Sequence, residues 1–159
     1  MTESVSRQLP SESATAEMAS ELAPLARTGD VILLSGDLGA GKSVFARAFI
    51  NALPGPQEEV PSPTFTLVQT YQRGAQEVWH FDLYRLESPE EAWELGFEEA
   101  LADGISLIEW PERLGGELPS SRLEIEIRYK TPQDSREARL TPVGTWCGRL
   151  AEQRGQDRA

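Results

Sequence analysis

Cysteine is nearly absent from this 159-residue chain, in which Cys147 stands alone. A single thiol excludes an internal disulfide and a zinc site built from several cysteines, so a packed core has to provide the stability. We expect Cys147 to be a small buried hydrophobic residue. Long apolar runs are also missing, since none reaches the roughly 18 residues that span a bilayer. The first ten residues lack an apolar signal-peptide core. These absences predict a soluble, cytoplasmic protein with no membrane partner.

Positive charge is scarce as well. Lys42 and Lys130 are the only lysines, and 26 acidic residues against 15 lysines and arginines give a net charge of −11. Proteins that bind nucleic acid directly neutralise phosphates with basic surfaces, which this chain has little of. If the protein serves an RNA pathway, we therefore expect another component to hold the RNA.

The length is close to the roughly 150-residue prior for one domain. Residues 1–159 are therefore predicted to form a single domain, with an ordered core at about 9–152 and frayed termini. Hydrophobic spacing predicts a helix from about residue 14 that Ser11 or Ser13 caps and that stops or kinks near Ala23. Further helices are predicted at 44–53, 89–102 and 145–152, and strands at 31–34, 64–71, 77–84, 105–108, 123–129 and 137–142. This order favours an α/β fold, a mixed β-sheet flanked by helices.

One loop carries a specific motif. Residues 36–43 read Gly-Asp-Leu-Gly-Ala-Gly-Lys-Ser and fit G-x-x-x-x-G-K-[ST] between a predicted strand and a predicted helix. In such a P-loop, backbone N–H groups and the positive helix end bind phosphates, the lysine reaches the β- and γ-phosphates, and the hydroxyl ligates Mg²⁺. The chain is thus predicted to be a P-loop NTPase-like domain. Its predicted nucleotide-binding residues are Gly36, Asp37, Leu38, Gly39, Ala40, Gly41, Lys42, Ser43 and Val44.

The nucleotide is expected to be ATP. GTPases carry Asn-Lys-x-Asp or Thr-Lys-x-Asp to read guanine, whereas Asn51 is the only asparagine here and is followed by Ala52. Neither lysine stands in such a motif.

Carboxylates at predicted strand ends are candidates for metal binding and catalysis. Glu109 ends the apolar strand 105–108, in the Walker B position with Glu in place of Asp, and can hold Mg²⁺. Asp82 lies on the same strand face as His80 and can act as a base, position water or complete the metal shell. His80 is the only histidine, and a lone histidine is more often structural. Thr64 lies in a segment that is either a rigid loop or a switch sensing the γ-phosphate.

Four blocks together resemble the TsaE (YjeE) family of bacterial P-loop ATPases, over residues from about Leu9 to Leu150. The blocks are the loop at 36–43, Ser-Pro-Thr-Phe at 62–65, His-Phe-Asp-Leu-Tyr-Arg at 80–85 and Ile-Glu-Trp-Pro-Glu at 108–112. The resemblance implies binding of ATP or ADP with Mg²⁺ and action on the TsaD–TsaB complex. That complex transfers a threonylcarbamoyl group to adenosine 37 of tRNAs reading ANN codons. The family's ATPase step is expected to reset the complex, and tRNA is contacted only through these partners.

The resemblance also assigns roles to individual residues. It makes Ser43 and Glu109 the Mg²⁺ ligands, Lys42 the phosphate clamp, Asp82 the acid most important for hydrolysis and Thr64 a switch-like residue. It places the loop around Ser11 and Glu12 near the base of the bound nucleotide. The sequence departs from the family pattern at two positions: Ser43 stands where threonine is common, and Phe65 stands where tyrosine also occurs. Both departures are mild, and the hydroxyl of serine can ligate Mg²⁺ as that of threonine does.

Two alternatives stay open. A small-molecule kinase also uses a loop with glycines spaced like Gly36, Gly39 and Gly41, but it needs an arginine-bearing lid, and residues 87–103 contain no arginine. A nucleotide sensor would use ATP to order residues 61–65 for partner binding without needing hydrolysis.

Overall fold

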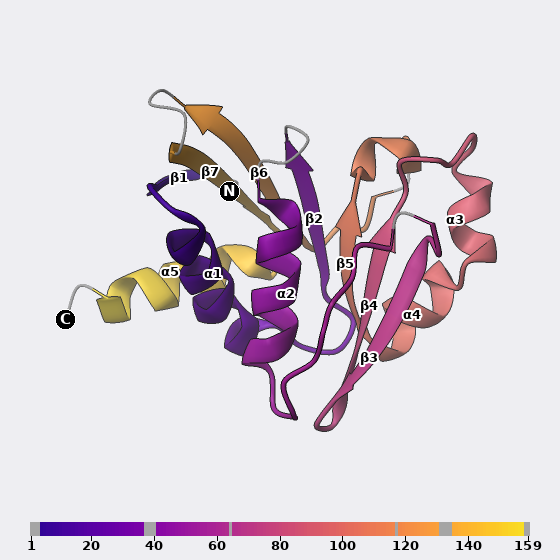
Figure 1. The fold of residues 1–159 in the computed structure, drawn as a ribbon, viewed down its shortest axis with the longest axis horizontal. Coiled ribbons are helices and arrows are strands. Elements are labelled where there is room, and N and C mark those ends of the chain that lie inside the picture. The colour runs from indigo at the N-terminus through magenta and orange to yellow at the C-terminus, as the bar shows by residue number, and fades with distance from the viewer. Residues whose placement is uncertain (1–3, 37–40, 64, 117, 131–134, 158–159) are drawn as a thin grey trace.

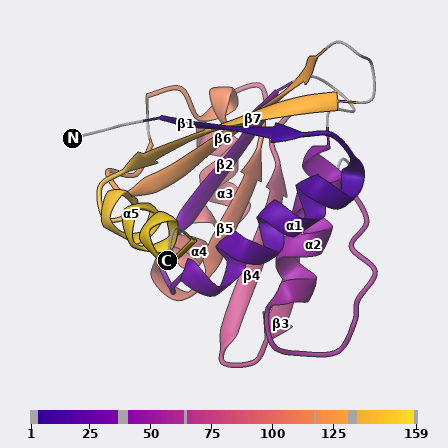
Figure 2. The same ribbon diagram turned by 90° about the vertical axis from the view of Figure 1, so that its left-hand side faces the viewer.

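A computed structural model gives the fold as a mixed β-sheet with helices on both faces (Figures 1 and 2). It describes residues 4–36, 41–63, 65–116, 118–130 and 135–157, and the side chains of these residues as far as Ala151. Five of the predicted site residues therefore lie outside the described residues: Asp37, Leu38, Gly39, Ala40 and Thr64.

The sheet has the strand order β1-β7-β6-β2-β5-β4-β3. Its strands are β1 (Val5–Leu9), β2 (Val31–Gly36), β3 (Val68–Arg73), β4 (Gln76–Asp82), β5 (Ile105–Glu109), β6 (Arg122–Lys130) and β7 (Ser135–Val143). The helices are α1 (Glu12–Leu22), α2 (Lys42–Ala52), α3 (Glu90–Glu94), α4 (Phe97–Asp103) and α5 (Trp146–Asp157), with 3₁₀ turns η1 (Ala23–Leu25) and η2 (Pro111–Leu114). The central strands β6, β2, β5 and β4 run parallel, and β1, β7 and β3 pair antiparallel to their neighbours.

Strand β2 shows why the sheet needs helices on both sides. Its four-residue apolar run is buried on both faces, as expected for a parallel strand inside an α/β sheet. Ile32 and Leu34 pack into the core cluster that also takes in apolar residues of α1, α2 and α5. Val31 and Leu33 pack into a second cluster with α3, α4 and η2. The predicted α/β class is confirmed.

Helix α1 begins and ends where the sequence predicts. The Ser11 side chain caps it by accepting a hydrogen bond from the Ala14 backbone N–H at 3.2 Å. After Leu22 the chain continues as η1, which contains Pro24. This confirms the predicted stop near Ala23. The physical cause is Pro24, since proline cannot continue an α-helix.

The helical stretch predicted at 89–102 is interrupted, because α3 and α4 are separate helices. Gly96 between them has φ 101°, a left-handed conformation that interrupts helical geometry. A Cβ at this position would come within 2.9 Å of the Trp79 ring. The break therefore lets the chain pass closely over Trp79 on β4.

The strand predicted at 64–71 starts later than expected, at Val68. Leu67 has φ 70°, and its backbone N–H donates to the Pro63 carbonyl at 2.7 Å, so a turn precedes β3. Phe65, in this turn, is 82% exposed. Alternating apolar residues suggested a strand, but the turn hydrogen bond decides the conformation.

Regular secondary structure extends beyond residues 9–152 at both ends. β1 begins at Val5, because residues 5–9 find an antiparallel partner in β7, and α5 continues to Asp157. Cys147 is half-buried and not fully buried, and its Sγ donates to the Pro142 carbonyl at 3.4 Å. In the part of the chain that the structure describes, no helix has the length and apolar character to cross a membrane.

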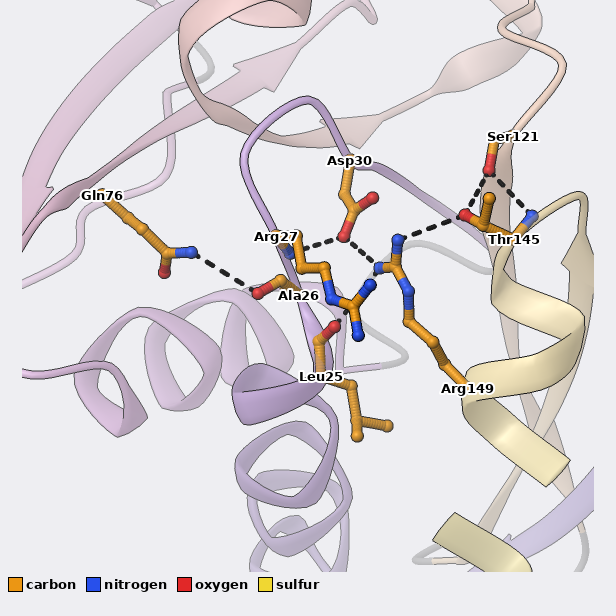
Figure 3. A network of polar contacts seen from close by, with 8 residues as sticks. All are labelled: Leu25, Ala26, Arg27, Asp30, Gln76, Ser121, Thr145 and Arg149. Carbon is orange, nitrogen blue, oxygen red and sulfur yellow. Dashed lines mark hydrogen bonds and ion pairs between the residues drawn. The ribbon is translucent and has the colours of Figure 1, made fainter. Parts of the chain in front are cut away.

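A polar network ties α5 to the start of β2 (Figure 3). The buried Asp30 carboxylate accepts a hydrogen bond from the Arg27 backbone N–H and forms an ion pair with Arg149 of α5. Arg149 also donates to the Leu25 carbonyl at 3.2 Å. Helix α5 is therefore held to the loop that leads into the central strand.

We predict that Arg149→Met lowers the free energy of unfolding by about 3 kcal/mol, because it leaves the buried Asp30 carboxylate without its cation. Urea denaturation measures the change. The matched control is Arg128→Met, since Arg128 pairs with Glu126 while its side chain is 64% exposed, and such a surface pair contributes about 0–1 kcal/mol. Equal effects of the two substitutions would contradict the prediction.

Candidate functional site

The predicted site residues converge at one edge of the sheet. Parallel strands β2, β5 and β4 lie side by side and end there at Gly36, Glu109 and Asp82. Ligands of open α/β sheets bind at this carboxyl edge. A cavity of about 180 Å³ lies there. Its lining residues are Glu12, Gly41, Lys42, Ser43, Val44, Ser62, Asp82, Glu109, Trp110 and Arg136.

The geometry at Gly36 requires glycine. Its φ is 131°, and it pairs in register with Ile127 of β6. A Cβ on Gly36 would lie 1.9 Å from the Ile127 carbonyl oxygen, far inside contact distance. Only glycine lets β2 stay paired with β6 to the point where the predicted phosphate-binding loop begins.

Helix α2 starts at the cavity. Gly41 precedes it with φ 118°, and the Gly41 carbonyl accepts the first helical hydrogen bond, from Phe45, at 2.9 Å. The first backbone N–H groups of a helix have no partner within it and carry its positive partial charge. With Lys42 and Ser43 in its first turn, this helix end can bind anionic oxygens such as those of phosphates.

Lys42 is buried, with only 5% of its surface exposed. Its Nζ lies 3.5 Å from the Gly36 carbonyl oxygen and 4.1 Å from the centre of the Trp110 ring. Trp110 has φ 60°, and its ring also contacts Tyr84 at 4.8 Å between centroids. A carbonyl oxygen and an aromatic face therefore stabilise the buried ammonium group.

The two predicted carboxylates are direct neighbours. Asp82 of β4 and Glu109 of β5 pair in register, and both are buried. Asp82 Oδ1 accepts a hydrogen bond from the Tyr84 backbone N–H at 3.0 Å. Glu109 Oε2 lies 2.7 Å from His80 Nε2. The carboxylates thus face one cavity while each is held by a neighbouring group.

The donors fit a hard cation bound together with a phosphate chain. Mg²⁺ prefers oxygen ligands and binds through one or two carboxylates plus phosphates and water. Ser43 and Glu109 supply such oxygens within the cavity lining. Among the described residues, no group of three or more His, Cys, Asp or Glu side chains could hold a metal ion by itself. A metal site here would therefore depend on the ligand's own oxygens.

Some lining residues were not among the predicted site residues. Trp110 falls in the motif block at 108–112 and Ser62 in the block at 62–65, and the family resemblance places Glu12 beside Ser11 near the nucleotide's base. The Ser11 side chain itself caps α1, and its contact with a base stays a prediction. Arg136 stands in the stretch Arg-Glu-Ala-Arg at 136–139, which also fits the family resemblance, and strand pairing brings it beside the start of α2.

The pairing around Arg136 is well defined. It stands opposite Leu9 of β1 and Tyr129 of β6, and its guanidinium lies 5.2 Å from the centre of the Tyr129 ring. The Arg136 Cδ is 3.8 Å from the position that a Cβ on Gly41 would take. Arg136 therefore puts a positive charge beside the start of α2.

The next residue on β7 helps to hold these strands together. Glu137 accepts hydrogen bonds from Lys130 of β6 and Gln8 of β1, at 2.9 and 2.7 Å. These two hydrogen bonds hold the pKa of the Glu137 carboxyl below its ordinary value, and the bond from Lys130 has the larger effect.

Comparison with known proteins identifies the family to which this chain belongs. A family model described as threonylcarbamoyl adenosine biosynthesis protein TsaE matches residues 9–138. The chain belongs to the TsaE family. It is 45% identical over 119 residues to a tRNA threonylcarbamoyladenosine biosynthesis protein TsaE from Rickettsia conorii, covering 75% of this chain and 68% of the relative. It is 39% identical over 140 residues to the protein of that name from Bacillus subtilis, covering 87% and 86% of the two chains.

A solved structure agrees with the fold of this TsaE family member. The crystal structure of YdiB from Bacillus subtilis matches with a TM-score of 0.81 and 30% sequence identity, over 100% of this chain and 99% of that chain. The TsaE resemblance and the predicted fold class are both confirmed.

We predict that Gly36→Ala destabilises this TsaE family member by about 3 kcal/mol or more, because the methyl group meets the β6 backbone and φ is unfavourable for alanine. Thermal or urea unfolding measures the loss. Gly116→Ala is the matched control, since a Cβ there meets nothing within 4 Å. A Gly36→Ala protein as stable as the control would contradict the assigned loop geometry.

Proposed function

We propose that this TsaE family member binds ATP or ADP with Mg²⁺, hydrolyses ATP and thereby supports threonylcarbamoyladenosine formation in tRNA. The observation that carries the proposal is the meeting of Lys42, Ser43, Asp82 and Glu109 in one cavity at the start of α2. Family membership supports the tRNA-modification role, because the curated relatives carry that role in their names.

Each residue has a role that its position supports. Lys42 and the first N–H groups of α2 bind the β- and γ-phosphates. Ser43 and Glu109 hold Mg²⁺, which when bound neutralises charge on the phosphate oxygens. Glu109 accepts a hydrogen bond from His80 at Oε2, and its carboxylate keeps lone pairs that would be available to the metal. Asp82 orients or deprotonates the attacking water.

Arg136 and Glu12 reach the cavity from β7 and α1, on the side away from the carboxylates of β4 and β5. The cavity of about 180 Å³ is smaller than the roughly 300–1,000 Å³ of ordinary ligand pockets. We infer that it takes the phosphate chain, while the nucleoside extends outward along the side of Ser11 and Glu12.

The proposed partner is the TsaD–TsaB complex, which holds the tRNA. A net charge of −11 disfavours direct contact with a polyanion, so tRNA is reached only through the partners. In this proposal, ATP hydrolysis resets the complex after it modifies adenosine 37 of tRNAs reading ANN codons. Thr64 keeps its proposed role as a switch-like residue that responds to the γ-phosphate.

We predict that Lys42→Ala and Asp82→Asn separate binding from hydrolysis. Lys42→Ala weakens ATP affinity about 10- to 100-fold, because it removes charge-assisted hydrogen bonds to phosphate. Asp82→Asn leaves ATP affinity within about threefold but slows hydrolysis about 100-fold or more, because the amide lacks the carboxylate's basicity. Calorimetry gives the affinities and phosphate release gives the rates. Equal ATP affinities for the two variants would contradict this division of roles.

The test of the whole proposal is ATP hydrolysis with and without the cognate TsaD–TsaB complex, with Lys42→Ala as the blank. We expect slow turnover alone and faster turnover with the complex. ATP binding without stimulation would favour a nucleotide sensor. Phosphoryl transfer to a metabolite from a panel would favour a small-molecule kinase.

A further inference from the structure

His80 and Glu109 form a buried pair directly behind the cavity. Their side chains are 1% and 5% exposed, and His80 Nε2 lies 2.7 Å from Glu109 Oε2. Glu109 lines the cavity, whereas His80 is not among its lining residues. The histidine therefore contacts the site only through the glutamate.

The direction of the hydrogen bond follows from the chemistry. An ionised carboxylate can only accept, so Nε2–H of His80 donates to Glu109. The other ring nitrogen, Nδ1, is buried and makes no hydrogen bond within the described part of the chain. Among the described residues, Glu109 is therefore the only hydrogen-bond partner of the imidazole.

Strand geometry makes His80 a rigid donor. It lies two residues before Asp82 on the same face of β4, and β4 pairs in parallel with β5, where Glu109 is the last residue. His80 therefore supports Glu109 from deeper in the sheet. Its backbone is held by strand pairing on both sides, since β4 lies between β3 and β5.

Glu109 needs such support more than an aspartate would. A Walker B carboxylate is usually Asp, and Glu adds one methylene and one further rotatable bond. A freely rotating Glu would lose side-chain entropy each time it bound a metal. Hydrogen bonds to metal-ligating carboxylates fix their orientation, and losing such a partner lowers metal affinity about 10- to 100-fold.

We propose that His80 is a positioning residue that holds the Glu109 carboxylate in place for Mg²⁺. The inference rests on the proposed function, because it takes Glu109 to be a metal ligand. It assigns a role to the one histidine of the chain, which sequence analysis treated as structural. A purely structural His80 would contribute to stability without affecting metal affinity.

A matched pair of amide variants tests this role. The Gln side chain places its N–H₂ group about where Nε2 of histidine lies, whereas the shorter Asn side chain falls short of Glu109. Binding of Mn²⁺, a paramagnetic stand-in for Mg²⁺, to the protein–ADP complex is measured by electron paramagnetic resonance. Metal-free ADP affinity and the urea unfolding midpoint are measured in parallel.

We expect His80→Asn to weaken Mn²⁺ affinity about tenfold, and His80→Gln to keep it within about threefold of the unsubstituted protein. Equal Mn²⁺ affinities for the two variants, with or without a loss of stability, would overturn the inference. If the unsubstituted protein binds neither ADP nor Mn²⁺, the proposed function itself fails. Normal binding by that protein combined with equal variants rejects the role of His80 alone.

Discussion

The parallel pairing of β2 with β5 on one side and β6 on the other is the constraint on which the rest depends. It fixes where β2 ends, and therefore where α2 starts. The same pairing brings Glu109 to that edge and, one strand further, Asp82. Helices on both faces bury the apolar side chains of the strand, so its position is set by the core.

The site concentrates charge in a place that stability alone would not favour. Lys42, Asp82 and Glu109 are each at most 5% exposed, and burying charge is costly unless each group has a partner. The partners are specific: an aromatic ring and a carbonyl for the lysine, a backbone N–H for the aspartate and the imidazole of His80 for the glutamate. Such an arrangement keeps charged groups ready for a ligand that can neutralise them.

Local sequence patterns predicted what depends on local physics. The apolar run at 31–34, the spacing of α1 with its Ser11 cap, and the loop ending in Lys42 and Ser43 all follow from side-chain periodicity or from backbone requirements within a few residues. Predictions failed where a distant contact decided. The Trp79 ring lies under the break at Gly96, and residues 5–9, whose polar sequence gives no strand pattern, pair with β7.

The sequence by itself determined the fold class, the family and the residues at the ends of β2, β5 and β4. Motif spacing and strand hydrophobicity are local properties that can be read directly from consecutive residues. The tertiary structure alone decided which of these residues meet. Arg136 reaches the start of α2 through pairing with β1 and β6, and His80 reaches Glu109 across two strands separated by more than twenty residues. Strand order in a sheet is set by long-range packing, so such contacts leave no mark on the local sequence pattern.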